Sequence, residues 1–356
     1  MGDKRQCEFS IGGATFDRQH TVVIAEAGVN HNGSLAIAEA LIVAAARAGA
    51  QVVKFQTYKA SDLTTTDAPR FWKWSGEASA VDSQYETYSK LDSFGRTEYE
   101  ILFQLCHQYG VEFLSTPFDF HSTDLLEDIG VRGFKIASCD ITNAPLLRHV
   151  ARKGLPILLS TGASEIDEIR AAVDTMLDTR EVSLLLMHCT LCYPTRDRDA
   201  NLAAIPHLQS CFPEHLVGLS DHTPGTLVPA SSVLYGTSAI EKHFTVDKTL
   251  PLSFDHTFGV DEAGLTQLVH DVATLRSAMG TGTKRVLACE RLARDNARRS
   301  VVAVRPLVEG ELVTLSDVAF KRPGVGVAPR DVDKVLGKRT TRKIEYDELI
   351  LESDVR

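Results

Sequence analysis

The sequence predicts an α/β fold, namely a (β/α)₈ barrel followed by a small β-rich module. Three observations support this prediction: short apolar runs alternate with amphipathic segments, eight such runs lie between residues 22 and 240, and every run ends in polar residues. Strands that alternate with helices are parallel, because each helix returns the chain to the start of the next strand. Eight such units match a barrel, whereas an open doubly wound sheet, the alternative, usually has about six strands.

The predicted strands are short runs of mostly β-branched and other apolar residues, which is the composition that strands favour. They cover residues 22–25, 52–55, 111–114, 133–137, 156–159, 182–187, 216–219 and 238–240. The segments between them have apolar residues at helical spacing. The predicted helices cover residues 35–48, 97–109, 123–129, 144–151, 165–177 and 226–235.

Polar residues stand at the C-terminal end of each predicted strand. Glu26 follows the first run, Gln56 the second, His222 the seventh and His243 the eighth. In a barrel of parallel strands these ends meet at one rim, where the active site forms. Solvated loops are also polar, but they less often place Lys, His and paired hydroxyls at the last strand positions each time. We therefore expect one active site at this rim.

Residues 64–95 interrupt the alternation with a long segment that is rich in Trp, Tyr, Ser and acidic residues. A loop of this length after a strand, on the catalytic rim, is typical of a lid or a partner-contact loop. A surface insertion without a catalytic role is the alternative interpretation.

The character of the sequence changes after His243. Residues 261–279 read as the last barrel helix, so the barrel domain is predicted to cover residues 1–280, with a linker over 281–296. Residues 297–356 form a separate small domain, with β-rich runs at 301–304, 312–314 and 318–320. A core of that size is marginally stable alone, so the domain is expected to dock on a barrel.

Composition and charge limit the partners and the compartment. The 356 residues carry a formal net charge of -9, which argues against binding of nucleic acid or of an anionic membrane surface. No apolar run reaches the ~20 residues needed to span a bilayer, and the first twenty residues lack the apolar core of a signal peptide. Seven cysteines, an odd number, favour reduced thiols and a cytoplasmic location.

Two lysines, Lys54 and Lys135, lie on predicted barrel strands. A buried ammonium needs a partner, which is either a carboxylate, from Glu26 or Glu241, or an anionic ligand. The hydroxyls that converge with the lysines favour a phosphate or carboxylate site. These hydroxyls belong to Thr116, Ser138, Ser160 and Ser220. A lysine in a barrel also raises Schiff-base chemistry, as in a lysine-dependent aldolase.

His222 and His243 close two neighbouring predicted strands. Imidazoles on adjacent strand ends can share one divalent ion, and mixed nitrogen and oxygen ligands with open positions suit Mn²⁺ or Mg²⁺. The candidates for oxygen or further ligands are Glu26, Asp221, Asp255 and His256. The alternative is that each histidine is a hydrogen-bonded core residue. The acids Glu26, Asp140, Glu241 and Asp255 act either as general acids and bases or as counter-ions.

Taken together, the motifs resemble one family, the sialic acid synthases, which make N-acetylneuraminic, legionaminic, pseudaminic and related nonulosonic acids. The motifs that carry this resemblance follow one another along nearly the whole chain. They are IAEAGVNHNGS (24–34), AGAQVVKFQT (48–57), DSQYE (82–86), FLSTPF (113–118), FKIAS (134–138), ITN (141–143), LSTGAS (159–164), MHCT (187–190), YPT (193–195), GLSDHT (218–223), IEKHFTVDK (240–248) and KRPG (321–324). The run ARRSVVA (297–303) resembles the start of the antifreeze-like (SAF) domain of that family.

The resemblance implies that the enol carbon of phosphoenolpyruvate attacks the aldehyde of an open-chain N-acetylated hexosamine. Water then adds, phosphate leaves, and the product is a nine-carbon 2-keto-3-deoxy acid. Carried over residue by residue, the phosphoenolpyruvate contacts are Lys54, Thr116, Lys135, Ser138 and Ser220. The divalent ion, Mn²⁺ or Mg²⁺, falls on His222 and His243. The sugar contacts fall on Gln56, Tyr193 and Asp255, and Asp140 is also expected to face the sugar. The predicted catalytic residues are Glu26, Lys54, Lys135, His222 and His243.

The resemblance also implies a domain-swapped homodimer, in which Arg322 reaches the sugar site of the other subunit. A closed site of this kind excludes water until the carbon–carbon bond forms.

Several positions depart from the pattern of the family. Asp140 stands where many relatives have Glu, and Ser253-Phe254-Asp255-His256 replaces the usual Gly-Pro-Asp-His turn. Leu191 stands where one branch of the family has Asn. These changes cluster near the expected sugar pocket and spare the lysine and histidine motifs. They predict family-like chemistry with a different acceptor. The alternatives are a non-sialic acceptor in a specialised pathway and neutral drift with N-acetylmannosamine still as acceptor.

Overall fold

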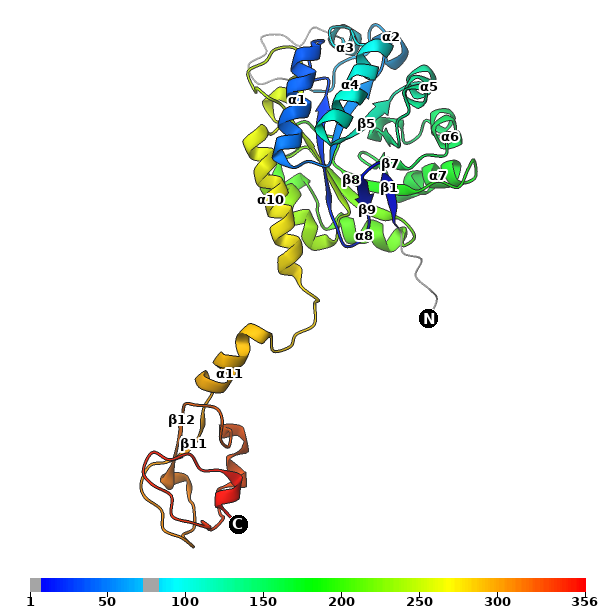
Figure 1. The fold of residues 1–356 in the computed structure, drawn as a ribbon. Helices are drawn as coiled ribbons and strands as arrows, with labels where there is room; N and C mark the ends of the chain where they lie inside the picture. Colours follow the sequence, from blue (N-terminus) through cyan, green and yellow to red (C-terminus); the bar gives the residue numbers. More distant parts are fainter. Residues whose placement is uncertain (1–7, 73–82) are drawn as a thin grey trace. The chain divides into compact units, whose positions relative to one another are not determined.

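The computed structural model describes residues 8–72 and 83–356, and it divides into two compact units, Met1–Gly280 and Thr281–Arg356 (Figure 1). Each unit has its own hydrophobic core. Of the helices in the described part of the chain, none has the length and apolar character of a membrane-spanning segment.

The first unit contains a sheet of eight parallel strands that curves into a barrel. The strands are β3 (Val22–Gly28), β4 (Val52–Thr57), β5 (Glu112–Pro117), β6 (Phe134–Ile136), β7 (Ile157–Ser160), β8 (Leu184–Cys189), β9 (Leu216–Asp221) and β10 (Ala239–His243). Their order is β5-β4-β3-β10-β9-β8-β7-β6, and the two end strands, β5 and β6, also lie side by side. The predicted (β/α)₈ barrel is therefore confirmed.

Helices cover the outside of the barrel, each after the strand that precedes it (Figure 1). They are α1 (Leu35–Ala48), α2 (Ala60–Leu63), α3 (Gln84–Ser89), α4 (Arg96–Tyr109), α5 (Phe120–Ile129), α6 (Ala144–Arg152), α7 (Ile166–Leu177), α8 (Ala204–Cys211), α9 (Leu227–Ser231) and α10 (Glu262–Met279). The helix predicted over 226–235 is α9 followed by a 3₁₀ turn, Ser232–Tyr235. Helix α8 was not predicted.

Most barrel strands continue past the ends that the apolar pattern predicts. β3 extends three residues further, to Gly28, and β10 extends to His243. The prediction ended several strands at polar residues, such as Glu26 and Glu241. These side chains are buried in the barrel interior and are paired there, so their polarity does not end the strand.

A short N-terminal hairpin, which the sequence analysis did not predict, closes the N-terminal end of the barrel. It consists of β1 (Phe9–Ile11) and β2 (Ala14–Phe16). The turn requires glycine at position 12, since φ is +57° and a Cβ there would lie 2.0 Å from the Glu112 carboxylate. Ile11 and Phe16 are fully buried against the inward-facing apolar residues of the strands. The C-terminal rim is thus the end at which a cavity can open.

The second unit has its own small core, formed around Val301, Val313 and Ile344. Its elements are α11 (Arg291–Ala297), β11 (Ser300–Ala303), β12 (Val318–Lys321) and the 3₁₀ turns Ala288–Glu290, Leu315–Asp317, Pro329–Lys334 and Glu352–Asp354. β11 and β12 pair antiparallel. The strand predicted over 312–314 is wrong, because in the described structure Leu312 makes only an isolated bridge to Arg339. Part of the stretch interpreted as a linker, 281–296, is helical in α11.

A buried ion pair joins β9 and β10 on the outer side of the barrel wall. Lys242 and Asp221 lie opposite each other in the strand register, and both are buried. Lys242 Nζ lies 2.7 Å from Asp221 Oδ2 and also donates a hydrogen bond to the carbonyl of Thr223. Because side chains alternate along a strand, the residues that follow them, His222 and His243, face the interior. The pair therefore fixes the relative position of the two histidines.

His31 lies in the turn between β3 and α1 and is 1% exposed. Its Nδ1 accepts a hydrogen bond from the Gly33 amide at 3.1 Å, and its ring stacks on Phe94 at 4.0 Å. Burial lowers the pKa of His31 to about 4, because the charged imidazolium loses its hydration there.

Replacement of Lys242 tests the buried pair. Lys242→Met leaves the Asp221 carboxylate buried without its counter-ion and is expected to lower the free energy of unfolding by about 3–5 kcal/mol. The measurement is urea denaturation, with Lys248→Met at an exposed position as the matched control. The double variant Lys242→Met/Asp221→Leu should recover much of the loss. A single variant as stable as the control would contradict this account.

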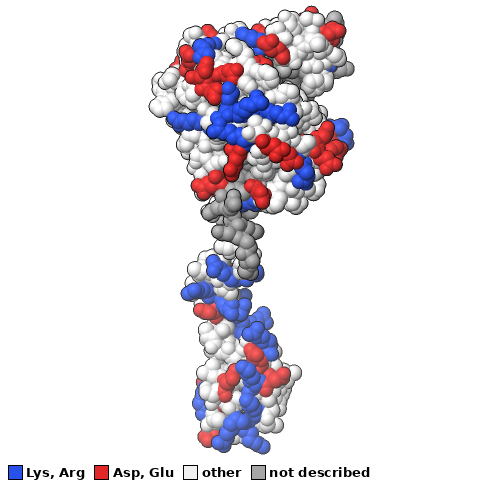
Figure 2. Space-filling view, turned by 90° about the vertical axis from the view of Figure 1, so that its right-hand side faces the viewer, with Lys and Arg blue, Asp and Glu red and all other residues white. Residues whose placement is uncertain are grey.

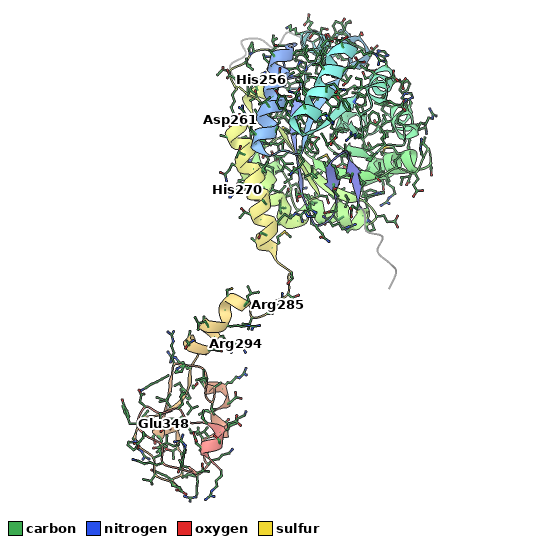
Figure 3. The ribbon with its side chains drawn as sticks, in the orientation of Figure 1. His256, Asp261, His270, Arg285, Arg294 and Glu348 are labelled. Carbon is green, nitrogen blue, oxygen red and sulfur yellow. The ribbon has the colours of Figure 1, made fainter. Side chains whose placement is uncertain are left out.

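His31 predicts a pH dependence of stability. Its pKa is lower in the folded state than the ~6.5 of the unfolded chain, so the unfolded state binds more protons as the pH falls from 6.5 towards 4. The contribution of His31 to the free energy of unfolding is fully present above pH 6.5. About 2 kcal/mol of this contribution is lost as the pH falls from 7 to 5. His31→Asn should reduce the change in unfolding free energy over that range by this amount. His270→Asn, on the outer helix α10 (Figure 3), should not.

Candidate active site

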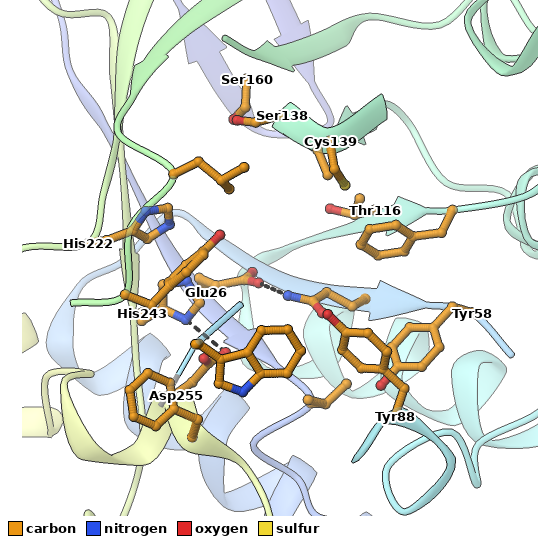
Figure 4. Close-up of a pocket in the computed structure, with 18 of the residues that line it drawn as sticks. Glu26, Tyr58, Tyr88, Thr116, Ser138, Cys139, Ser160, His222, His243 and Asp255 are labelled. Atoms are coloured by element: carbon orange, nitrogen blue, oxygen red, sulfur yellow. Dashed lines mark hydrogen bonds and ion pairs between the residues drawn. The ribbon is translucent and has the colours of Figure 1, made fainter. Parts of the chain in front are cut away.

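A cavity of about 360 Å³ opens at the C-terminal ends of the barrel strands (Figure 4). Each of the eight strands contributes at least one lining side chain. In strand order these are Glu26, Lys54, Thr116, Lys135, Ser160, Cys189, Ser220 and Glu241. Apart from the candidate ligands Asp221 and His256, the predicted site residues in the first unit line this cavity. They are Glu26, Lys54, Gln56, Thr116, Lys135, Ser138, Asp140, Tyr193, Ser220, His222, His243 and Asp255.

Lys54 lies in the barrel interior and has two acidic neighbours. Its Nζ is 2.8 Å from Glu26 Oε2 and 3.7 Å from Glu241 Oε1, and it donates a hydrogen bond to Thr116 Oγ1 at 3.1 Å. Burial opposes the charge, but Glu241 and Glu26 raise the pKa of Lys54, so the ammonium stays protonated. The interpretation of Glu26 and Glu241 as counter-ions therefore agrees with the geometry.

Lys135 is less fully paired than Lys54. Its Nζ donates to Ser160 Oγ at 2.6 Å, and its nearest carboxylate, Glu241 Oε2, is 3.7 Å away. Burial lowers the pKa of Lys135. This ammonium faces the cavity and has room for an anionic ligand, so the carboxylate pairing and the anion-site interpretation do not exclude each other.

The two buried glutamates have opposite protonation tendencies. Burial raises the pKa of Glu26, which accepts a hydrogen bond from Gln56 Nε2 at 2.8 Å. Glu241 is also buried, but the ammonium groups of Lys135 and Lys54 lower its pKa to about 2. The two lysines therefore hold Glu241 in its anionic form, whereas burial favours the neutral form of Glu26.

The two predicted histidines face each other across the end of β9 and β10, with ring centroids 5.2 Å apart. His222 Nδ1 lies 2.9 Å from the carbonyl oxygen of Thr190, and His243 Nδ1 lies 3.1 Å from Asp255 Oδ2 (Figure 4). Since each Nδ1 has an acceptor beside it, we assign the proton to Nδ1. The lone pair of each Nε2 is then available to bind a metal ion. Burial lowers the pKa of His222 to about 3, so its imidazole is neutral.

This donor set fits a divalent ion with open coordination positions. Two imidazoles, one of them oriented by a carboxylate, are a common metal-binding arrangement. Within the described residues there is no cluster of three or more His, Cys, Asp or Glu side chains arranged around one point. Oxygen atoms of substrate and water would then complete the coordination.

Two of the candidate ligands lie elsewhere, so those predictions are wrong. Asp221 faces the outer side of the barrel, where it pairs with Lys242. His256 is fully buried, with Nδ1 2.7 Å from Thr245 Oγ1 and Nε2 3.2 Å from Asn32 Oδ1. The sequence placed both residues near the rim, but alternation along the strand and a turn direct their side chains away from the cavity.

The residues predicted to contact the sugar come from strand β4, which carries Gln56, and from three loops. Tyr193 packs on His222 with ring centroids 4.2 Å apart. Asp140 ends a 3₁₀ turn, Ser138–Asp140, and accepts a hydrogen bond from Asn143 at 3.2 Å. Ser138 Oγ in turn accepts from the amide of Gly162 at 3.0 Å, an approach that requires glycine because a Cβ would lie 2.8 Å from that oxygen.

Sequence reasoning missed an aromatic part of the cavity, which we call the aromatic box: Tyr58, Trp72, Tyr88 and Phe118. Tyr88 lies on α3, which begins in a capping box between Ser83 and Glu86. This helix belongs to the segment predicted as a lid, whose residues 73–82 lie outside the described residues. The described parts of that segment line the cavity. The abundance of Trp and Tyr in the segment was the available signal.

Arg322 lies in the second unit, beside β12, and is exposed. It has no hydrogen bond or ion pair with the described residues. Its predicted role at the sugar site stays a prediction.

The fold and the cavity together define a class of protein. A (β/α)₈ barrel whose C-terminal rim carries buried lysines, glutamates and a pair of histidines is an enzyme that acts on a small molecule.

Comparison with known proteins identifies the family. The NeuB family matches residues 41–284, and the SAF domain matches residues 298–356. The chain therefore belongs to the NeuB family, the sialic acid synthases, as its motifs predicted. It is a transferase that forms carbon–carbon bonds.

Individual relatives support the same assignment. The chain is 38% identical to the N,N'-diacetyllegionaminic acid synthase of Legionella pneumophila, over 92% of this chain and 93% of that protein. It is 29% identical to the human N-acetylneuraminate-9-phosphate synthase, over 93% of this chain and 91% of that protein. Among solved structures, the N-acetylneuraminic acid synthetase of Leptospira borgpetersenii is 34% identical, with a TM-score of 0.71 over 81% of this chain and 95% of that one.

Proposed function

We propose that this enzyme condenses phosphoenolpyruvate with an open-chain aldose to give a nonulosonic 2-keto-3-deoxy acid and phosphate. The observation that carries this proposal is one cavity that combines two buried lysines with a facing pair of histidines, in a chain of the NeuB family. In this reaction the enol carbon of phosphoenolpyruvate bonds to the aldehyde carbon, water adds to the resulting oxocarbenium carbon, and phosphate leaves.

Phosphoenolpyruvate is a small, highly charged anion, and the inner part of the cavity offers matching groups. We assign its binding to Lys54, Thr116, Lys135, Ser138 and Ser220. Lys135 supports this assignment most directly, because its ammonium faces the cavity with its nearest carboxylate 3.7 Å away. An anion beside it would gain a charge-assisted hydrogen bond in a site of low dielectric constant.

The catalytic groups would have different roles, which follow from their charge and protonation state. When bound at His222 and His243, Mn²⁺ or Mg²⁺ supplies Lewis-acid polarisation of the aldehyde oxygen. Asp255 orients His243 through Nδ1, at 3.1 Å. Glu26, whose pKa burial raises, takes a proton from the water that adds, and its hydrogen bond from Gln56 holds the carboxyl group in place. Glu241 stays ionised as the counter-ion of both lysines.

The acceptor sugar would lie above these groups, in contact with Gln56, Asp140, Tyr193 and Asp255. We further propose that Arg322 of a partner subunit reaches this site in a swapped homodimer. Charge complementarity supports docking of the second unit on a barrel: residues 281–356 contain 16 Lys and Arg against 12 Asp and Glu, whereas the whole chain has a net charge of -9 (Figure 2). Opposite net charges of this kind favour association.

One observation favours a second candidate function, a pyruvate aldolase that forms a Schiff base. Burial lowers the pKa of Lys135, and a nucleophilic lysine requires a lowered pKa. Its hydrogen bond to Ser160 Oγ holds the amine in the cavity.

An assay of both co-substrates separates the two functions. Purified enzyme with Mn²⁺, phosphoenolpyruvate and a panel of aldoses is expected to release phosphate only when an aldose is present, with formation of a 2-keto acid seen by mass spectrometry. Lys135→Met should raise the KM for phosphoenolpyruvate by about a hundredfold, since it removes a charged hydrogen-bond donor. Borohydride reduction with pyruvate that leaves a covalent adduct on Lys135 would instead establish the aldolase.

The histidine pair is tested by metal binding without turnover. His222→Ala removes one of two nitrogen donors and should weaken Mn²⁺ binding by about tenfold or more, measured by isothermal titration in the absence of substrates. Activity should fall with it. His270→Ala, at an exposed position on α10, is the control. Equal Mn²⁺ affinity of both variants would show that the histidines do not hold the ion.

A further inference from the structure

The turn between β3 and α1, residues 29–34, contains an Asn-His-Asn-Gly sequence to which the proposed function gives no role. The side chains of Asn30, His31 and Asn32 do not line the cavity. Two of them, Asn30 and Asn32, instead bond to the segment that follows β10. That segment carries Asp255, whose carboxylate lies against His243.

We propose that Asn32 and His256 are positioning residues, which fasten the 3₁₀ turn Phe254–Thr257 to the β3–α1 turn. This attachment holds the carboxylate of Asp255 against Nδ1 of His243. The proposal rests on the proposed function, because it gives both residues an effect on the divalent ion at the histidine pair. Neither residue touches the cavity, so their effect passes through Asp255.

The hydrogen bonds of Asn32 determine which ring nitrogen of His256 carries the proton. The amide nitrogen of Asn32 donates to the carbonyl of Pro251 at 2.7 Å, so its Oδ1 faces His256. Because Oδ1 only accepts, His256 Nε2, 3.2 Å away, is the protonated nitrogen. His256 Nδ1 then accepts from the hydroxyl of Thr245 at 2.7 Å. One chain of hydrogen bonds thus joins the β3–α1 turn to two points of the segment after β10.

The β3–α1 turn is a firm support for this chain of hydrogen bonds. Asn30 is fully buried, and its amide nitrogen donates to the carbonyl of Phe244 at 2.8 Å. Asn32 has a φ of +50°, and asparagine is one of the few residues besides glycine that adopt this conformation readily. Asparagine therefore fits position 32 for two reasons, its backbone conformation and its pairing of one donor with one acceptor.

The segment after β10 is more exposed and depends on this attachment. Lys248, Thr249 and Leu252 are exposed, whereas His256 is fully buried. Exposed loops move more than the elements that they connect unless a buried group holds them. His256 is such a group, and its hydrogen bond to Asn32 reaches an element on the other side of the segment.

The held turn supplies two neighbours of His243. Asp255 Oδ2 lies 3.1 Å from His243 Nδ1 (Figure 4), and Phe258, directly after the turn, packs on the His243 ring with centroids 4.9 Å apart. Successive side chains of a 3₁₀ turn point about 120° apart, so one turn directs Asp255 into the cavity and His256 away from it. Movement of the turn would therefore remove the group that orients His243 as a metal ligand.

The first experiment removes the attachment. Asn32→Gly takes away the side chain, while glycine accepts the positive φ. It is expected to weaken Mn²⁺ binding to the full-length protein by about tenfold, measured by isothermal titration without substrates. Asn201→Gly is the matched control, because Asn201 also has a positive φ, +44°, and is exposed. An Mn²⁺ affinity of Asn32→Gly equal to that of the control would overturn the proposal.

A double-mutant cycle separates positioning from a general loss of stability. If Asn32 acts through Asp255, Asn32→Gly should change the Mn²⁺ affinity little in a protein that already carries Asp255→Ala. Losses of affinity that add in the double variant would show that Asn32 acts by another route.

The assigned proton on His256 predicts rescue by one of two conservative variants. The side-chain nitrogen of Gln reaches the position of Nε2 and can donate to Asn32, whereas the shorter side chain of Asn reaches only the position of Nδ1. His256→Gln should therefore keep the Mn²⁺ affinity within about threefold of the unmodified protein, and His256→Asn should lose about tenfold. Equal affinities of these two variants would contradict the role of Nε2.

NMR of the histidine ring protons keeps this inference separate from the proposed function. In the metal-free protein, the Nδ1 proton of His243 is expected to exchange slowly with water, because Asp255 accepts it. Asn32→Gly should lose this signal and Asn201→Gly should keep it. If the unmodified protein binds no Mn²⁺, the proposed metal site fails, and the NMR signal still decides whether Asn32 positions Asp255. A signal that is unchanged in Asn32→Gly overturns the inference.

Discussion

The structure depends on the burial of four charges inside the barrel. Lys54, Lys135, Glu26 and Glu241 are each at most 4% exposed. An isolated charge in such a place costs several kcal/mol, so each ammonium must lie near a carboxylate. Glu241 meets this need for both lysines, with 3.7 Å to each, and Glu26 adds a closer contact to Lys54. The same arrangement leaves Lys135 partly unpaired and therefore available to an anionic substrate.

This constraint also explains why the cavity is divided into a charged inner part and an aromatic outer part. The strands place charged groups where neighbouring strands can compensate them, at distances fixed by the sheet. Loops have no such fixed partners. Their contribution to the cavity is mostly uncharged side chains, among them rings such as Trp72 and Phe118, which need no compensation, together with the carboxyl groups of Asp140 and Asp255. Binding of an anion inside and of a less polar group outside follows from this division.

The sequence predicted the barrel because alternating runs and polar strand ends are properties of single segments. Most of the residues that it proposed for the site do line one cavity at this rim, since parallel strands share that end. It failed where the answer depends on the direction of one side chain: Asp221 follows an inward-facing serine and so faces outward, to Lys242. It missed Tyr88 because α3 is reached through a long irregular segment, whose path no periodicity records.

The roles of the two glutamates show what only the three-dimensional arrangement provides. Glu26 and Glu241 are chemically identical, and both are buried at the ends of adjacent strands, β3 and β10. Glu241 lies between two ammonium groups, which lower its pKa to about 2. Glu26 has only Lys54 as an ammonium neighbour, so burial, together with the charge of Glu241, raises its pKa. The difference in pKa between the two glutamates thus depends on which charged groups lie within reach, and this is set by which strands are neighbours.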